Sequence, residues 1–437
     1  MMKIKLFALI VITGITAILN AQNFWLNSYS PTNINLKKAT FTDSLTGWVC
    51  GDSGLIIHTT NGGQNWIRQN SNTKAFLHDI FFLNKRLGWA LGWNIFNPQP
   101  PYGTYILKTT NGGVVWDTTF FPYENVFLKK VYFQDSLYGF FGGNFKNILR
   151  TTNGGLTWLD VEIDSNVVMN FPVLNFSFYN RDYGYAVGGV IDIAGVIWRT
   201  TNRGIRWTPY VAAPEPNIDM MFFDSLRILS FGGDYEYGAS VVTTTNSGAN
   251  WEYRSLEYFG LPMVLAFRTL SDGWASLGFQ QTFLFTQDSG RSFNQIQTPD
   301  SSVINDIVFP GPKHGYAIGE SGRIYKFNPT TVGIINPGIN TFEKFELKQN
   351  YPNPFNPTTT ISYEIRTNSY VILKVFDISG KEIRTLQNGY QTQGNYNIKF
   401  NSANLPSGVY FYRLTVRDLS GKTGNFTTET RKMVIVK

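Results

Sequence analysis

Large apolar residues alternate with polar ones in short runs between residues 36 and 327, and Gly, Asn, Asp and Ser separate these runs. A two-residue period of this kind is typical of β-strands. The runs fall into groups of four. One group predicts strands at about 78–83, 87–92, 104–109 and 114–120. The chain is therefore predicted to be all-β.

An eight-residue signature, Thr-Thr-Asn-Gly-Gly-x-x-Trp, recurs at the predicted turn between the third and fourth strands. Its copies, of which the last three are altered, stand at Thr59–Trp66, Thr109–Trp116, Thr151–Trp158, Thr200–Trp207, Thr244–Trp251 and Thr286–Phe293. A spacing of roughly forty to fifty residues indicates a repeated structural unit. One such sheet cannot bury both of its faces, whereas sheets stacked radially can, so the repeats predict a β-propeller.

The ends of the repeat region predict the number of blades. Seven apolar strands with a following glycine or its equivalent are present, but only six signature turns link them. Trp25 precedes Gly47 by 22 residues, which is close to the spacing that follows each signature tryptophan. We therefore expect residues about 23–30 to form the outer strand of the last blade, so that residues 22–328 make a seven-bladed propeller.

The signature residues suit a structural role. An Asn or Asp oxygen can accept backbone N–H groups, glycine can take a positive φ, and the aromatic ring can be buried between blades, where an indole N–H needs a partner. A calcium or substrate site at the Asn is the alternative, although a catalytic residue is rarely repeated six times. The positions are Asn61, Gly63, Trp66, Asn111, Gly113, Trp116, Asn153, Gly155, Trp158, Asn202, Gly204, Trp207, Asn246, Gly248, Trp251, Asp288, Gly290 and Phe293.

The signature resembles the Asp-box, or bacterial neuraminidase repeat, of sialidases, sortilin-type receptors and xyloglucan-cleaving glycosidases. Those families place the box at the blade periphery, away from the active site. The whole unit, with its Gly88–Gly92 strand, is most similar to the photosystem II assembly and stability factor propellers, which have seven blades. The resemblance covers about residues 23–328 and implies the fold, but it implies little about function.

Residues 1–21 are predicted to be a signal peptide. Two lysines precede the apolar stretches Leu6–Ile12 and Ile15–Leu19, and Ala21 offers a small residue for cleavage. A membrane anchor is the alternative, but the apolar run is short and contains polar residues. No later segment is long and apolar enough to span a membrane, so we expect no transmembrane segment after cleavage.

The C-terminal part changes pattern. Residues 329–344 are rich in Pro, Gly, Asn and Thr and are predicted to be a linker. Strands are then expected at Thr360–Ile365, Tyr370–Phe376, Glu382–Leu386, Tyr396–Phe400, Val409–Val416 and Lys432–Val436, with a turn at Ile378–Lys381. Roughly seven short strands in under a hundred residues favour a small Ig-like β-sandwich.

Residues 345–437 resemble the type A C-terminal sorting domain of the type IX secretion system. The motifs that carry the resemblance are Gln349–Pro357, Val375–Gly380, Leu405–Phe411 and Lys432–Lys437. The resemblance implies that the type IX machinery is a partner and that the protein is delivered to the cell surface. Such domains are commonly removed, and the protein is then released or attached to surface lipopolysaccharide. An ordinary Ig-like adhesion module is the alternative.

Charge and composition exclude several classes of function. The formal net charge is +7, but residues 22–333 hold 22 Lys and Arg against 23 Asp and Glu, and residues 334–437 hold 13 against 7. The large domain is thus about neutral, and we expect no nucleic-acid partner. The single cysteine, Cys50, and three scattered histidines point to no metal site and no cofactor.

Binding is a better prediction than catalysis. No sialidase-type Phe-Arg-Ile-Pro stretch occurs, and no spacing singles out the pair of carboxylates that a glycosidase needs. Three loops on the channel face are long: Trp93–Gly103, Val190–Gly195 and Asp234–Tyr237. Their candidate ligand-binding residues are Trp93, Phe96, Tyr102, Asp192, Asp234, Tyr235, Glu236 and Tyr237.

Aromatic rings beside carboxylates suit a sugar or a peptide. We therefore predict non-catalytic binding of a surface glycan or protein. The alternatives are a secreted glycoside hydrolase, an assembly factor for a membrane protein complex, and loop residues that serve only packing.

Overall fold

A computed structural model describes residues 24–95, 101–144, 148–164, 171–329, 345–365, 368–377, 381–418 and 426–437. The predicted signal peptide, Phe96 and nearly all of the predicted linker lie outside these ranges. The chain divides into two compact units, Met1–Val332 and Gly333–Lys437. Within the described ranges, the chain contains no helix with the length and apolar character needed to cross a membrane.

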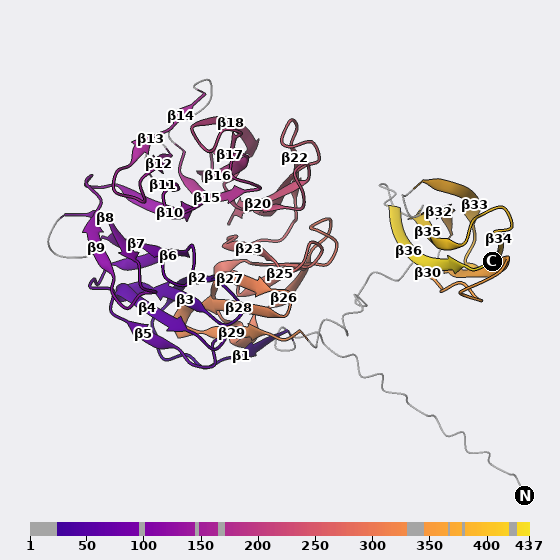
Figure 1. Cartoon of the computed structure of the whole chain (residues 1–437), viewed down its shortest axis with the longest axis horizontal. Helices are drawn as coiled ribbons and strands as arrows, with labels where there is room; N and C mark the ends of the chain where they lie inside the picture. The colour runs from indigo at the N-terminus through magenta and orange to yellow at the C-terminus, as the bar shows by residue number, and fades with distance from the viewer. Residues whose placement is uncertain are drawn as a thin grey trace, which may run out of the picture. The chain divides into compact units, whose positions relative to one another are not determined.

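The first unit contains seven sheets among its described residues, set in a ring in Figure 1. Blade 1 comprises β2 (Leu36–Phe41), β3 (Gly47–Gly51), β4 (Leu55–Thr59) and β5 (Ile67–Gln69). Blade 2 comprises β6 (Phe76–Phe82), β7 (Gly88–Asn94), β8 (Gly103–Thr109) and β9 (Asp117–Phe120). Blade 3 comprises β10 (Phe127–Phe133), β11 (Gly139–Asn144), β12 (Leu149–Thr151) and β13 (Leu159–Asp160).

Blade 4 gains a fifth strand from the segment that follows blade 3. It comprises β15 (Val173–Phe178), β16 (Gly184–Val190), β17 (Ala194–Thr200) and β18 (Arg206–Ala213), with β14 (Glu162–Ile163) parallel to β18. Blade 5 comprises β19 (Asn217–Phe222), β20 (Ile228–Asp234), β21 (Gly238–Thr244) and β22 (Glu252–Ser255). Blade 6 comprises β23 (Val264–Phe267), β24 (Gly273–Ser276), β25 (Thr282–Thr286) and β26 (Asn294–Gln297).

Blade 7 joins the two ends of the propeller. Its strands are β27 (Ile304–Gly311), β28 (His314–Gly319), β29 (Ile324–Phe327) and β1 (Trp25–Asn27). Trp25 pairs with Phe327 across the antiparallel ladder, and its buried ring also packs against Trp274 of blade 6. The predicted closure of a seven-bladed ring by its first strand is confirmed. Short 3-10 turns, η2 (Asp52–Gly54), η3 (Gly278–Gln280), η4 (Pro299–Ser301) and η5 (Glu320–Gly322), complete the unit.

The signature turn has one hydrogen-bond pattern in every copy. In the first copy, the Thr59 hydroxyl accepts the Gly63 N–H at 2.9 Å and donates to the Asn61 Oδ1, which accepts the Asn65 N–H at 3.0 Å. Gly63 has a φ of 67°. The same three bonds recur in the other five copies. These bonds and the positive φ are the local contacts that the predicted structural role of the turn requires.

One detail of that prediction is wrong. The Trp116 indole N–H donates to Gln69 Oε1 and the Trp207 N–H to the Gly204 carbonyl, as expected. The buried Trp66 N–H has no partner among the described residues. Its ring packs against Phe41 and Tyr316, so burial of the ring between blades outweighs the unpaired N–H.

The described residues of the second unit form two sheets. One contains β30 (Phe345–Leu347), β31 (Thr358–Ile365) and β34 (Gly394–Asn401). The other contains β32 (Ser369–Phe376), β33 (Glu382–Gln391), β35 (Gly408–Asp418) and β36 (Phe426–Ile435). Inward side chains from both sheets, including Ile361, Leu373 and Tyr412, share one buried core. The predicted β-sandwich is confirmed, while residues 378–380 of the predicted turn lie outside the described ranges.

Candidate ligand-binding face

One face of the propeller gathers the start of each innermost strand and the turn between the second and third strands. In blade 1, Leu36 at the start of β2 pairs with Gly51 at the end of β3, and the register is similar in the other blades. The signature turns lie at the opposite end of the third strands. The candidate loops and the channel mouth therefore share one face, and the signature turns lie on the other.

A bulge in six of the seven innermost strands turns a polar side chain into the channel. Register shifts occur just ahead of Lys38, Asp79, Lys130, Asn175, Asp219 and Asp306. These side chains link neighbouring blades. Asp306 accepts the Ala39 N–H at 2.9 Å and Asp79 accepts the Val131 N–H at 2.8 Å. The lysines complete the links, because Lys38 bonds Asp306 at 2.7 Å and Lys130 bonds Asp79 at 3.2 Å.

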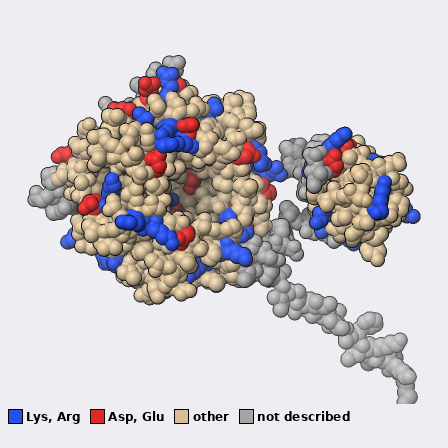
Figure 2. Space-filling view, in the orientation of Figure 1, with Lys and Arg blue, Asp and Glu red and all other residues tan. Residues whose placement is uncertain are grey.

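The channel mouth is a pocket of about 370 Å³. Its lining includes Lys37, Lys38, Lys129, Lys130, His78, Asp79, Asp219, Trp93 and Met263. Figure 2 shows a hollow at the centre of the propeller with acidic and basic side chains in and beside it. Six of the fourteen lining residues are charged, and apolar side chains such as Trp93 and Met263 supply much of the rest.

Burial and neighbouring charges set the protonation states in this pocket. Burial lowers the pKa of Lys38, but the carboxylates of Asp306, Asp219 and Asp79 outweigh it and hold the pKa above its ordinary value. Burial lowers the pKa of His78 to about 4, so its imidazole is neutral at pH 7. Burial also lowers the pKa of Lys129.

The first predicted loop is partly strand. Trp93 lies within β7, half-buried, and its indole N–H donates to the Leu128 carbonyl of blade 3 at 2.7 Å. It also packs against His78, with ring centroids 4.3 Å apart. Trp93 therefore borders the channel pocket and joins two blades as well. Tyr102 is half-buried just before β8, and Phe96 lies outside the described ranges.

The second and third predicted loops are three-residue turns, because their flanking strands are longer than expected. Strand β16 extends to Val190 and β17 begins at Ala194, while β20 extends to Asp234 and β21 begins at Gly238. Tyr235, Glu236 and Tyr237 form the tip of the second of these turns, and all three are exposed.

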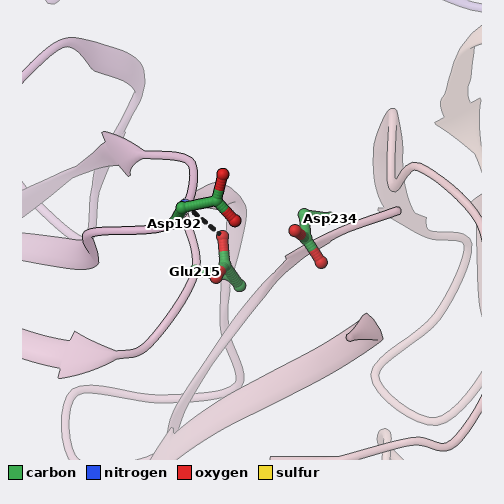
Figure 3. Close-up of side chains that lie close together, drawn as sticks. All are labelled: Asp192, Glu215 and Asp234. Carbon is green, nitrogen blue, oxygen red and sulfur yellow. Dashed lines mark hydrogen bonds between the residues drawn. The ribbon is translucent and has the colours of Figure 1, made fainter. Parts of the chain in front are cut away.

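Three carboxylates converge between these turns (Figure 3). The oxygens of Asp192, Glu215 and Asp234 lie within 4.8 Å of one another. Glu215 accepts the Asp192 N–H at 3.1 Å, and Asp234 accepts the Tyr237 N–H at 2.7 Å. Asp192 is exposed, whereas Glu215 and Asp234 are each only 3% exposed. The structure thus brings together two of the predicted residues and adds a third that was not predicted.

The environment of Glu215, the third residue of the cluster, raises its pKa. Burial raises the pKa of Glu215, and the nearby carboxylates of Asp234, Asp192 and Glu236 raise it further, against the opposing effect of the Asp192 N–H. Three such oxygens can attract a cation, whether a metal ion or an ammonium or guanidinium group. Glu215 stands between two prolines in the segment joining blades 4 and 5, so the sequence pattern marked it only as part of a connection.

The C-terminal unit matches a known family. Residues 349–435 match the family model described as a secretion system C-terminal sorting domain. The C-terminal unit is a type IX sorting domain. A sorting domain of this kind implies secretion to the cell surface or beyond it.

The propeller is similar to photosystem II assembly factors. It is 40% identical over 47 residues to the chloroplastic photosystem II stability/assembly factor HCF136 of Oryza sativa subsp. japonica. The match covers 10% of this chain and 11% of that relative, so the chain spans only a small part of its length.

Solved structures confirm the fold. A structure described as YCF48 bound to D1 peptide has a TM-score of 0.55 at 20% identity, covering 70% of this chain and 96% of that one. The Niastella koreensis GH74 enzyme has a TM-score of 0.52 at 11% identity, covering 92% of this chain and 67% of that one. At these identities the likeness shows the propeller fold and not a shared activity.

Proposed function

We propose that this protein is a secreted, non-catalytic binding propeller that recognises a protein or glycan partner at the cell surface. The sorting domain supplies the export, and the channel face of the propeller supplies the recognition. The convergence of Asp192, Glu215 and Asp234 beside the exposed Tyr235 and Tyr237 carries the proposal. Loops on a rigid β-scaffold are a common place for binding residues.

The channel pocket supports the same proposal. Its charged groups are largely paired with one another through Lys38, Lys130 and their aspartate partners, which is an arrangement that holds blades together. Lys37, Lys129 and Trp93 also line the pocket. A similar propeller has been solved with a peptide bound, which favours a protein partner.

Glycoside hydrolysis is the second candidate, and Glu215 is the observation that favours it. A buried carboxyl with a raised pKa, close to other carboxyl groups, is the pattern of a general acid. The contacts of the cluster weigh against it, because Glu215 and Asp234 already accept backbone N–H groups. If the protein hydrolyses glycans and Glu215→Gln abolishes that activity, the enzymatic function replaces the binding function.

The binding function is tested with glycan and peptide arrays probed by the purified full chain. We expect binding that Tyr235→Ala weakens strongly. Leu156→Ala is the matched control, because it removes an exposed apolar side chain from a signature turn on the opposite face. Equal binding by both variants would contradict the proposed face.

Export is tested by deleting residues 345–437. We expect the truncated protein to remain in the periplasm, where cell fractionation would find it folded. Delivery of the truncated protein to the cell surface would contradict a sorting role for this domain.

A further inference from the structure

The rim of the channel face is apolar on one side of the ring. Large side chains at the turns of blades 4, 5 and 6 are exposed: Ile193 is 64% exposed, Tyr237 55%, Phe259 66% and Phe279 60%. The equivalent turns of blades 1 and 7, Asp52–Gly54 and Glu320–Gly322, carry no exposed large apolar side chain among the described residues. Contiguous exposed apolar surface of this kind marks an interaction site.

Hydrogen bonds and close approaches join these turns into one surface. The Ala239 N–H donates to the Tyr258 carbonyl at 2.8 Å, which holds Phe259 beside the Tyr235–Tyr237 turn. The Met263 N–H donates to the Ser276 carbonyl at 3.0 Å, just ahead of the turn that carries Phe279. The acidic cluster joins the turns of blades 4 and 5 at the other end. We call this surface, made of residues 191–193, 234–237, 257–263 and 279, the apolar rim.

Every charged residue of the apolar rim is acidic. Asp192, Glu215, Asp234, Glu236 and Glu257 lie on it or at its edge. No lysine or arginine occurs in residues 189–195, 213–219, 232–239, 256–264 or 277–282. The propeller as a whole is about neutral, so this concentration of acidic residues is local to one side of its channel face. Like charges held this closely are relieved by a cation.

We propose that the apolar rim docks a protein partner through a basic side chain, an arginine or lysine flanked by apolar residues, with the cation placed between Asp192, Glu215 and Asp234. This proposal deepens the proposed function, on which it rests, by naming the chemistry of the partner. Tyr235 and Tyr237 can pack against the stem or the charged end of the inserted side chain. The apolar flanks of the partner would cover Ile193 and Phe259, which are otherwise exposed.

The experiment selects ligands from a random dodecapeptide library on the immobilised full chain, in buffer containing EDTA. Kd values of the selected peptides are then measured by fluorescence anisotropy. We expect the selected peptides to be enriched in Arg or Lys next to Leu, Phe or Tyr. Asp234→Asn, Glu236→Gln and replacement of the peptide arginine by citrulline should each weaken binding about tenfold.

The control variant is Glu320→Gln, which removes a carboxylate from the equivalent turn of blade 7 and should leave Kd unchanged. Glu236 is exposed, so its variant keeps the test valid even if Asp234→Asn disturbs its turn. Peptides without basic residues, or a Kd unaffected by Glu236→Gln and Asp234→Asn, would overturn the proposal.

Other occupants of the rim also have distinct outcomes. Binding that requires calcium and is abolished by EDTA would assign the carboxylates to a metal ion and overturn the proposal. If peptide binding is lost with Lys129→Ala and not with Asp234→Asn, the peptides bind at the channel mouth. That result would overturn the inference about the apolar rim and leave the proposed function standing. Absence of any bound peptide or glycan would overturn the proposed function together with the inference.

Discussion

Trp25 lies opposite Phe327 in the ladder of the last blade, although the two residues stand at opposite ends of the propeller sequence. The centroids of their rings are 5.2 Å apart, and the ring planes meet at 73°. Without this pairing, the third strand of blade 7 would be an unpaired edge, and the ring would have a seam with two free sheet edges. The seven blades thus depend on a contact between the first and last strands.

Trp25→Ala should therefore destabilise the propeller substantially. Removing a buried aromatic ring from a packed core costs about 3–5 kcal/mol. Urea unfolding followed by tryptophan fluorescence measures the change in midpoint. Leu26→Ala is the control, because Leu26 is exposed on the same strand and should shift the midpoint little. Similar shifts for both variants would mean that the first strand contributes no specific packing.

Replacing the threonine at the start of a signature turn should lower the free energy of unfolding. Thr109→Val keeps the side-chain shape but removes the hydroxyl that accepts the buried Gly113 N–H at 2.9 Å. Leaving a buried donor unpaired costs about 1–3 kcal/mol. The neighbouring Thr110 is exposed, so Thr110→Val should be nearly neutral. Thermal or urea unfolding of the two variants side by side tests the difference.

His78 should make the propeller sensitive to acid. The pKa of His78 is about 4 in the folded protein against an ordinary value of 6.5, because burial disfavours the charged ring. Between these values the unfolded chain binds a proton that the folded chain does not, so stability falls as the pH drops from about 6.5 to about 4. His78→Asn should reduce this loss, as judged by urea midpoints across the window. His314→Asn removes an exposed histidine and should retain the wild-type pH dependence.

Cys50 should be inert in the folded protein. Its side chain is fully buried in β3, and burial raises the pKa of the thiol well above its ordinary value. A thiol-reactive dye should therefore label it only as the propeller unfolds, in step with the fluorescence transition in denaturant. Rapid labelling under native conditions would show that blade 1 opens independently of the rest.

Much of the fold was predictable because the turn residues repeat. Asn61 and Gly63 have local roles that any copy of the turn requires, and the spacing from Trp25 to Gly47 identified the closing strand. Two of the three residues in the acidic cluster were predictable from the sequence. Asp192 and Asp234 stand in turns, but Glu215 reaches them from a blade connection, and strand register in three dimensions decides that meeting.

The polar channel was not predictable for a related reason. Lys38 and Asp306 are 268 residues apart, and each follows a bulge that shifts its strand by one position. A strict two-residue alternation assigns such positions to the wrong face. The hydrophobic pattern therefore located the strands well but could not predict the ion pairs inside the ring.

The closing strand also constrains the order of events during biogenesis. Residues 25–27 leave the ribosome long before residues 325–327, to which they pair. Until β29 has been made, β1 has no partner strand and the ring of blades stays open. Closure of the ring is consequently a late step, taken after nearly all of the propeller chain has been synthesised, and the first strand must stay accessible until then.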